Sequence, residues 1–435
     1  MVDPVSLPLT PAQYGLWYAH HLDPADPGHN TAELVELRGA VDVAALRAAV
    51  RVAAEESGAL GTAFTVDGSD VRQVRGAEPV PVAEVDLSAE PDPVAAALAW
   101  IDADLAVPAD LAGAPAAAEV VFVLGPEHVA WYQRAHHILL DGYGYALIAT
   151  RVAEVYRALV SGAPAPPSPF GALADVVAEQ RAYRSGARFG VDRDWWLGRM
   201  ADRPDAVSPA RSATRGRGFV RGHAEVDPAV AARLAGRGMV PLAAAAAGLL
   251  VQRVCGADEV VLGLPMMVRL GKAARVPTTA VNVLPLRVAA TPRTTVGELV
   301  AAVAAELRAV SAHQRYRGED LRRDLRLPAA EPLVGPWVNI KPFTPRLDFG
   351  GPAATTRYLS AGVVRDLNIG LSGNGTDLAI AVDGNPGGYA AEDVTAHAEA
   401  FAHVLDALSA ADPDTPTGAL GLRADRPAAR GRGRE

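Results

Sequence analysis

The stretch His136-His137-Ile138-Leu139-Leu140-Asp141-Gly142 lies where an expected strand is followed by an expected helix. Residues 129–137 include adjacent tryptophan and tyrosine, which favour a strand. Over residues 145–160 apolar side chains recur at helical spacing, which predicts a helix. Gly142 and Gly144 lie between the expected strand and this helix and break the pattern there, so we expect Asp141 in a tight connection. Because side chains alternate along a strand, the two histidines should point to opposite sides, one toward a cavity and one toward the packed interior.

Three kinds of chemistry are open to this stretch. Two histidines and an aspartate supply three metal ligands, although neighbouring histidines on a strand point apart, which makes joint coordination awkward. A Ser-His-Asp hydrolase is disfavoured, because no Gly-x-Ser-x-Gly turn precedes a helix in this chain. The third is acyl transfer without a protein nucleophile, in which one histidine orients or deprotonates an amine or hydroxyl that attacks a thioester. A histidine pair at a strand end is also a common structural feature, so the stretch alone does not decide.

The composition indicates a globular chain of more than one domain. Its 435 residues are 50% hydrophobic and 21% charged, and this length favours two or three domains. A formal charge of −9 argues against nucleic acid as a partner, and the single cysteine, Cys255, permits no internal disulfide. The start of the chain lacks a signal-peptide pattern, and the longest apolar run, residues 239–251, is too short to span a bilayer. We therefore expect a cytoplasmic protein with no membrane partner.

Local signals predict a mixture of helices and strands along the whole chain. Thr10 and Gln13 flank a helix start with Pro11 in its first turn, and the His20-His21 pair of that helix is expected at the surface. Residues 161–169, rich in proline, indicate a linker. Further helices are expected over residues 43–56, 93–105, 170–196, 242–255, 296–313 and 391–408, and strands over residues 118–124, 128–137, 259–264, 337–340, 366–371 and 378–382.

The central stretch and its surroundings resemble the condensation domains of nonribosomal peptide synthetases. His-His-x-x-x-Asp-Gly is similar to the signature of that family, and an ordered set of other segments extends the resemblance over nearly the whole chain. One departure is Ala54-Glu55-Glu56, where the family usually has Arg-His-Glu. The segments that resemble family motifs are residues 9–17, 60–64, 170–183, 194–196, 262–269, 280–286, 313–316 and 335–340.

The resemblance implies a fold and a domain division. The fold class is α/β with mixed sheets, arranged as two chloramphenicol-acetyltransferase-like lobes in a V-shaped pseudo-dimer with a central tunnel. Residues 1–169 would form the N-terminal lobe that carries the signature, and residues 170–420 the C-terminal lobe. Residues 421–435, with Arg423, Arg426, Arg430, Arg432 and Arg434, would be a linker-like basic tail.

The resemblance also implies an activity and its residues. The domain would form an amide bond by attack of a carrier-bound aminoacyl amine on a carrier-bound acyl, aryl or peptidyl thioester. His137 would face the tunnel and contact the attacking amine, whereas His136 would be packed and structural. The supporting residues would be Asp141 paired with Arg269, Asn339 lining the same region, and Gly142, whose backbone N–H is a candidate oxyanion donor.

By the same resemblance, the substrates would arrive on 4′-phosphopantetheine arms of donor and acceptor carrier proteins, and an adenylation domain would lie next to this one. No cofactor or metal of its own is expected, and the retained histidine pair argues against the heterocyclising branch of the family. Tyr143-Gly144-Tyr145 and Met266-Met267 are most similar to first-module domains of siderophore and lipopeptide synthetases, which take aryl or acyl donors. Two alternatives stay open: a free-standing acyltransferase acting on a small soluble alcohol or amine, and an inactive carrier-docking module.

Overall fold

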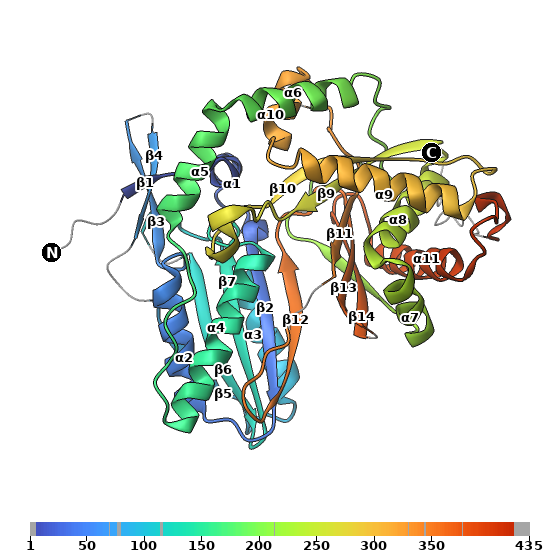
Figure 1. Cartoon of the computed structure of the whole chain (residues 1–435). Helices are drawn as coiled ribbons and strands as arrows, with labels where there is room; N and C mark the ends of the chain where they lie inside the picture. Colours follow the sequence, from blue (N-terminus) through green and yellow to red (C-terminus); the bar gives the residue numbers. More distant parts are fainter. Residues whose placement is uncertain are drawn as a thin grey trace, which may run out of the picture. The chain divides into compact units, whose positions relative to one another are not determined.

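The computed structural model describes residues 6–68, 70–75, 80–113, 116–212, 214–328, 330–342, 345–375 and 377–421 (Figure 1). It divides into two compact units. The first comprises Met1–Gly186, Met267–Val281 and Pro345–Val363, and the second comprises Ala187–Met266, Asn282–Thr344 and Val364–Glu435. Each unit contains a sheet with both parallel and antiparallel neighbours, which confirms the predicted α/β class with mixed sheets.

Each unit is assembled from three separate segments of the sequence, whereas each predicted lobe is one continuous segment. The boundary between residues 169 and 170 stays a prediction, and the first unit also takes in two segments from later in the chain. The basic tail falls, from residue 422 on, outside the described residues.

The first unit is built on a five-stranded sheet with strand order β12-β2-β7-β6-β5. All neighbours are antiparallel except β5 and β6. The first unit also contains a three-stranded sheet with strand order β1-β4-β3. The elements of this unit are β1 (Ser6–Pro8), α1 (Pro11–Leu22), β2 (Asn30–Arg38), α2 (Val43–Ser57), β3 (Thr62–Asp67), β4 (Asp70–Arg75), β5 (Val82–Asp86), α3 (Pro93–Leu105), β6 (Ala117–Gly125), β7 (His128–His136), α4 (Gly142–Ser161), α5 (Leu173–Ser185) and β12 (Ala353–Ala361).

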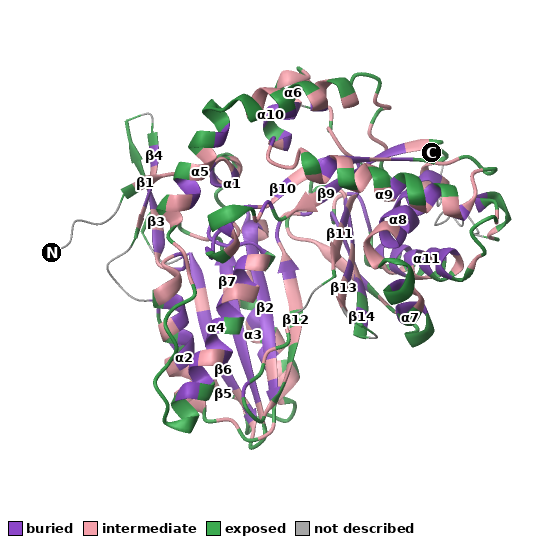
Figure 2. Ribbon diagram, viewed as in Figure 1, coloured by how far each residue is buried: buried purple, intermediate pink, exposed green. Residues whose placement is uncertain are grey.

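Both faces of the five-stranded sheet are covered, so its central strands are buried (Figure 2). Trp131 and Ala135 of β7 pack on one face with residues of α2 and α4. Ala130 and Tyr132 point the other way and pack with residues of α3. Successive side chains of β7 therefore pack into two different hydrophobic cores, one on each face of the sheet, and both sides of the strand are apolar for this reason.

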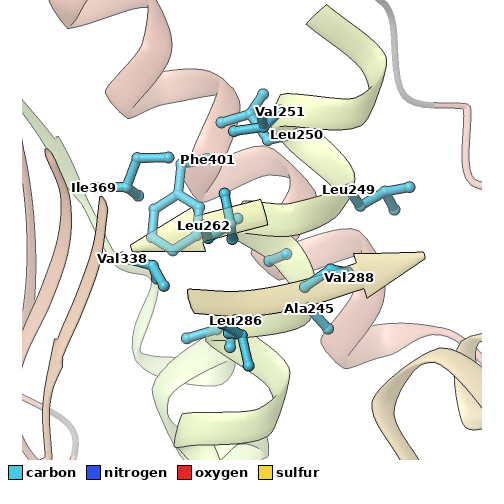
Figure 3. Packing of buried hydrophobic residues seen from close by; sticks show 14 of the residues in the cluster. Ala245, Leu249, Leu250, Val251, Leu262, Leu286, Val288, Val338, Ile369 and Phe401 are labelled. Atoms are coloured by element: carbon cyan, nitrogen blue, oxygen red, sulfur yellow. The ribbon is translucent and has the colours of Figure 1, made fainter. Parts of the chain in front are cut away.

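The second unit is built on a six-stranded sheet with strand order β10-β9-β11-β13-β14-β8. Its helix α8 is buried from Leu242 to Gln252, as expected for a helix that is apolar all round. Figure 3 shows side chains of this core, including Leu249, Leu262 and Phe401. The elements are α6 (Ala187–Arg199), β8 (Val220–Glu225), α7 (Pro228–Arg237), α8 (Met239–Cys255), β9 (Glu259–Met266), β10 (Asn282–Ala289), α9 (Val296–Ala312), α10 (Gly318–Asp324), β11 (Trp337–Lys341), β13 (Leu367–Asn374), β14 (Asp377–Gly384) and α11 (Ala391–Ala410).

Small residues on α8 allow close packing of the helix on the sheet. A Cβ atom built on Gly248 would lie 2.5 Å from Cγ1 of Val288 on β10, so only glycine fits. Of the described helices, none taken singly is both long and apolar enough to cross a membrane, and α7 with α8 passes that test only as a pair bent by 113°.

Most predicted helices are confirmed to within about one turn. The capping box of Thr10 and Gln13 starts α1, and α3 has the predicted bounds. The helical stretch predicted over residues 170–196 is confirmed, and it consists of two helices, α5 and α6, which are interrupted at Gly186.

Glu119 is a buried carboxyl in the first unit, and no cation pairs with it in the part of the chain that the structure describes. It is 1% exposed, and its Oε2 accepts a hydrogen bond of 2.7 Å from Nε1 of Trp131. Within the described residues, its Oε1 and both amide atoms of its cross-strand neighbour Gln133 have no hydrogen-bond partner. Burial raises the pKa of Glu119 to about 8, so the folded protein holds this carboxyl protonated at neutral pH.

We expect Glu119→Gln to raise the free energy of unfolding by about 4 kcal/mol at about pH 7.5. The folded-state pKa lies above the ordinary value of 4.5, so the stability that Glu119 contributes is complete below 4.5 and is lost as the pH rises through about 8. The amide stays neutral and still accepts from Trp131, so its advantage should grow with pH. Urea unfolding at several pH values measures this, with Glu127→Gln, an exposed residue of the same hairpin, as the control. An unchanged or lower stability at high pH would contradict the prediction.

Candidate active site

The stretch 136–142 forms a strand end, a turn and a helix start. Strand β7 ends at His136, and Asp141 is the N-cap of α4, where its Oδ1 accepts a hydrogen bond of 3.0 Å from the Gly144 N–H. Gly142 and Gly144 were predicted to lie in the connection between the strand and the helix, but both belong to the first turn of α4. Gly144 is needed there for close packing: a Cβ atom would lie 2.9 Å from Cδ2 of Leu140.

His136 is buried among other imidazoles. It is 1% exposed, and its ring centroid lies 5.1 Å from that of His20 and 5.2 Å from that of His29. Its Nδ1 accepts a hydrogen bond of 3.1 Å from the Ile138 N–H, so the proton of the neutral ring is on Nε2. Burial holds the pKa of His136 well below its ordinary value, which keeps the ring neutral. The surface position predicted for His20 is wrong: it is 6% exposed because it packs against this cluster.

His137 lies in the turn and is only partly buried. The strand predicted through residue 137 ends one residue earlier, so the turn, and not strand alternation, separates the two rings. The backbone N–H of His137 donates to the His29 carbonyl at 2.8 Å, and its Nδ1 lies 2.8 Å from the Leu140 carbonyl oxygen. Because a carbonyl oxygen only accepts, Nδ1 carries the proton and Nε2 presents a lone pair. This is the tautomer that a base at Nε2 requires.

Asp141 and Arg269, predicted to pair, form a buried ion pair. The Arg269 Nη2 to Asp141 Oδ1 distance is 2.5 Å, and the side chains are 4% and 6% exposed. The Asp141 Oδ2 accepts from the Ala280 N–H at 2.8 Å. Asp141 thus joins the start of α4 to the segment Met267–Val281, both within the first unit.

The Nη atoms of Arg269 also donate to backbone carbonyls of its own segment, whereas its buried Nε has no hydrogen-bond partner within the described residues. Nη1 donates to the carbonyls of Val276 at 2.7 Å and Ala273 at 3.2 Å, and Nη2 donates to that of Thr278 at 2.5 Å. The ring of Tyr143 lies over the guanidinium, 5.2 Å from centroid to Cζ. The preceding residue, Val268, has a φ of +44°, a strained conformation for a β-branched residue.

Gly142 and Asn339 complete the predicted set. Gly142 is the first residue of α4, where backbone N–H groups have no intrahelical acceptor. Asn339 belongs to the second unit, on β11, where it pairs with Gly370 of β13. Its place beside the signature stays a prediction.

Within the described ranges, no group of three or more His, Cys, Asp or Glu side chains is arranged to hold a metal ion. The site therefore consists of one imidazole with a free Nε2 lone pair, supported by an ion pair and a helix start.

Comparison with known proteins identifies the family. The family model described as Condensation domain matches residues 5–429. The chain belongs to the condensation domain family. The starter condensation domain of rhizomide synthetase RzmA, solved in complex with C8-CoA, superposes with a TM-score of 0.91 at 32% identity and covers 96% of this chain and 98% of that one. The first condensation domain of the calcium-dependent antibiotic synthetase gives a TM-score of 0.89 at 32% identity, with 95% and 98% covered.

Two curated relatives are much longer than this condensation domain. The isonitrile lipopeptide synthase of Streptomyces coeruleorubidus is 45% identical over 430 residues, which cover 96% of this chain and 29% of that protein. The dimodular nonribosomal peptide synthase of Bacillus subtilis is 40% identical, with 93% and 18% covered. The chain thus spans less than a third of these relatives. Condensation domains of such synthetases form amide bonds by acyl transfer, and this is the enzyme class of the chain.

Some residues of this condensation-domain site had no sequence signal. The Leu140 carbonyl that fixes the His137 tautomer is a backbone group, and Gly362, where a Cβ atom would lie 3.0 Å from the His137 ring, is one glycine among many. Glu56, in the segment that departs from the family pattern, holds the buried Arg151 of α4 with hydrogen bonds of 2.7 and 2.8 Å. These bonds lower the pKa of Glu56. Glu56 stands where the family's Arg-His-Glu has its glutamate, and this match was the available signal for the pair.

Proposed function

We propose that this condensation domain joins a donor acyl group to an acceptor amine, with both substrates carried as thioesters on the 4′-phosphopantetheine arms of carrier proteins. One observation carries the proposal: the Nδ1–H of His137 is held by the Leu140 carbonyl, which leaves Nε2 as a proton acceptor. His136 cannot take this role, because it is buried and its Nε2 carries the proton.

In the reaction, the acceptor nitrogen attacks the donor thioester carbon, the C–N bond forms and the C–S bond breaks. An α-ammonium group must lose a proton before it attacks, and Nε2 of His137 accepts it. After the attack the nitrogen loses a second proton; one of the two protons goes to the departing thiolate and the other to solvent, so no protein nucleophile and no cofactor of this chain is needed. The Gly142 N–H is our candidate donor to the oxyanion, and Asn339 a candidate lining residue.

We further propose that the donor is an acyl or aryl group, as in a first module. The isonitrile lipopeptide synthase is 45% identical, enterobactin synthase component F of Escherichia coli K12 is 34% identical, and a starter condensation domain was solved with C8-CoA. The proposal includes donor and acceptor carrier proteins as partners, an adjacent adenylation domain and a cytoplasmic location. It also keeps the division into lobes 1–169 and 170–420 with a linker-like tail.

The test is a reconstituted condensation. One carrier is loaded with an octanoyl or aryl donor and a second with an aminoacyl acceptor, and the joined product on the second carrier is measured by mass spectrometry. We expect product only when both carriers are loaded. Product formed equally well with a free, untethered amine would instead support a free-standing acyltransferase. Carrier binding without product would support an inactive docking module, and peptidyl donors reacting faster than acyl donors would contradict the first-module assignment.

A further inference from the structure

Gly362 lies beside the imidazole of His137, so near that a side chain on it would press on the ring. It follows the end of β12 and has a φ of +95°, a conformation that side chains with a Cβ rarely adopt. A Cβ atom built on it would lie 3.0 Å from Cδ2 of His137 and 3.4 Å from Cγ2 of Thr31. All three residues belong to the first unit, although Gly362 is 225 positions after the histidine in sequence.

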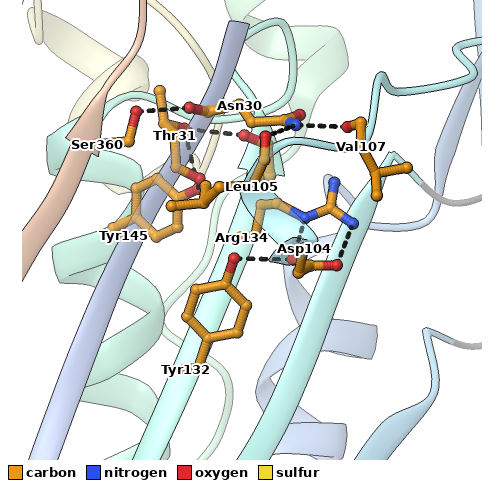
Figure 4. Close-up of polar contacts among 10 residues, drawn as sticks. Asn30, Thr31, Asp104, Leu105, Val107, Tyr132, Arg134, Tyr145 and Ser360 are labelled. Carbon is orange, nitrogen blue, oxygen red and sulfur yellow. Dashed lines mark hydrogen bonds and ion pairs between the residues drawn. The ribbon is translucent and has the colours of Figure 1, made fainter. Parts of the chain in front are cut away.

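The position of Gly362 is fixed through the start of β2. The Ser360 Oγ donates to the Asn30 carbonyl at 2.7 Å (Figure 4). The Gly362 N–H donates to the same Oγ at 3.3 Å. Asn30 is itself anchored, because its Nδ2 donates to the carbonyls of Leu105 at 3.0 Å and Val107 at 2.8 Å. Asn30 and Thr31 are the first two residues of β2, and they pair with His136 and Ala135 of β7, the strand that leads into the site.

Two features bear on the orientation of the His137 ring. Its Nδ1 is bound to the Leu140 carbonyl. Its other edge, at Cδ2, the carbon bonded to Nε2, faces Gly362, where a Cβ atom would lie 3.0 Å away. The hydrogen bond fixes one ring atom and still permits tilting, and the ring can keep its present tilt only because residue 362 has no side chain. The missing side chain also leaves the space beside Nε2 open to an approaching amine.

We propose that Gly362 is a positioning residue, which sets the orientation of the His137 imidazole and keeps the approach to Nε2 open. The crossover strand β12 is thereby part of the active site of the first unit. The inference rests on the proposed function for the role of His137, but the contact itself can be tested without turnover.

The main test is Gly362→Ala. We expect kcat in the two-carrier assay to fall about 10- to 100-fold with a small change in KM, because a displaced ring reduces proton transfer more than substrate binding. The second readout is the pair of ring ¹⁵N resonances of His137 in histidine-labelled protein, identified among the ten histidines by their loss in His137→Ala. We expect these resonances to shift or broaden in Gly362→Ala.

The matched control is Gly162→Ala at the end of α4. Gly162 has a φ of +70°, and a Cβ built on it meets nothing within 4 Å, so this variant introduces the same kind of backbone strain away from the imidazole. It should keep the wild-type kcat and the His137 resonances. Equal losses of kcat in both glycine variants would overturn the proposal, as would unshifted His137 resonances in Gly362→Ala.

Ser360→Ala offers a test that introduces no clash. It removes the bonds to Asn30 and Gly362 and should loosen the ring contact, with a smaller fall in kcat and broader His137 resonances. Sharp, unshifted resonances in this variant would contradict the part assigned to β12. If wild-type protein forms no product, the proposed function fails, whereas the resonances still decide whether Gly362 orients the ring.

Discussion

His137→Ala is expected to lower kcat/KM for condensation by about 10²- to 10⁴-fold, the usual range for loss of a general base. The imidazole has its proton on Nδ1, bound to the Leu140 carbonyl, so the lost group is the Nε2 lone pair. The ring is only partly buried, and its removal should leave the free energy of unfolding within about 1 kcal/mol of the wild type. Product formation from two loaded carriers measures the rate, with His403→Ala, an exposed histidine on α11, as the control.

The pH dependence of the variant separates a base from a positioning group. An α-amino group has a pKa of about 8, so above that pH the acceptor amine is neutral without help. If His137 removes a proton, the deficit of His137→Ala should shrink as the pH rises from about 6.5 to about 9. A deficit of the same size at every pH would indicate a positioning role, and an undiminished rate would exclude His137 from the mechanism.

Elements with local signals were the ones that the sequence predicted well. Helix α3 has an aspartate cap, a proline in the first turn and helical spacing, and its bounds were predicted to the residue. Strand β12 was missed because its exposed residues are polar and its partner, β2, lies more than 300 positions earlier. The pairing of β12 with β2 is a long-range tertiary contact, which leaves no pattern in the local sequence.

The candidate site shows the same difference between residues with a sequence signal and residues placed only by tertiary packing. His137, Asp141 and Arg269 belong to segments that resemble family motifs, and the structure places the last two in an ion pair. The groups that orient His137 are a backbone carbonyl and a glycine, and neither residue type is informative by itself. The burial of His20 was missed for a related reason, because a histidine near a helix end is usually solvated and only the tertiary packing buries this one.

Asp141→Ala is expected to lower the free energy of unfolding by about 3–5 kcal/mol, the usual loss when one partner of a buried ion pair is removed. The substitution deletes the acceptor of three hydrogen bonds, from the Gly144 N–H, the Ala280 N–H and Arg269. It also leaves the Arg269 charge buried, with only backbone carbonyls to bind it. The loss is therefore larger than that of an ordinary helix cap, which is about 1 kcal/mol.

Urea unfolding of Asp141→Ala measures this loss. Two further variants test whether the loss comes from the buried ion pair. Asp348→Ala breaks an exposed pair with Arg157 in the same unit, whose side chains are 69% and 46% exposed, and should cost less than about 1 kcal/mol. The double variant Asp141→Ala/Arg269→Met removes the stranded charge and should recover part of the stability, because replacing both partners avoids an unpaired buried ion. If Asp141→Ala instead unfolds like the wild type while condensation is lost, Asp141 acts in the chemistry and the ion pair is not the support we assign to it.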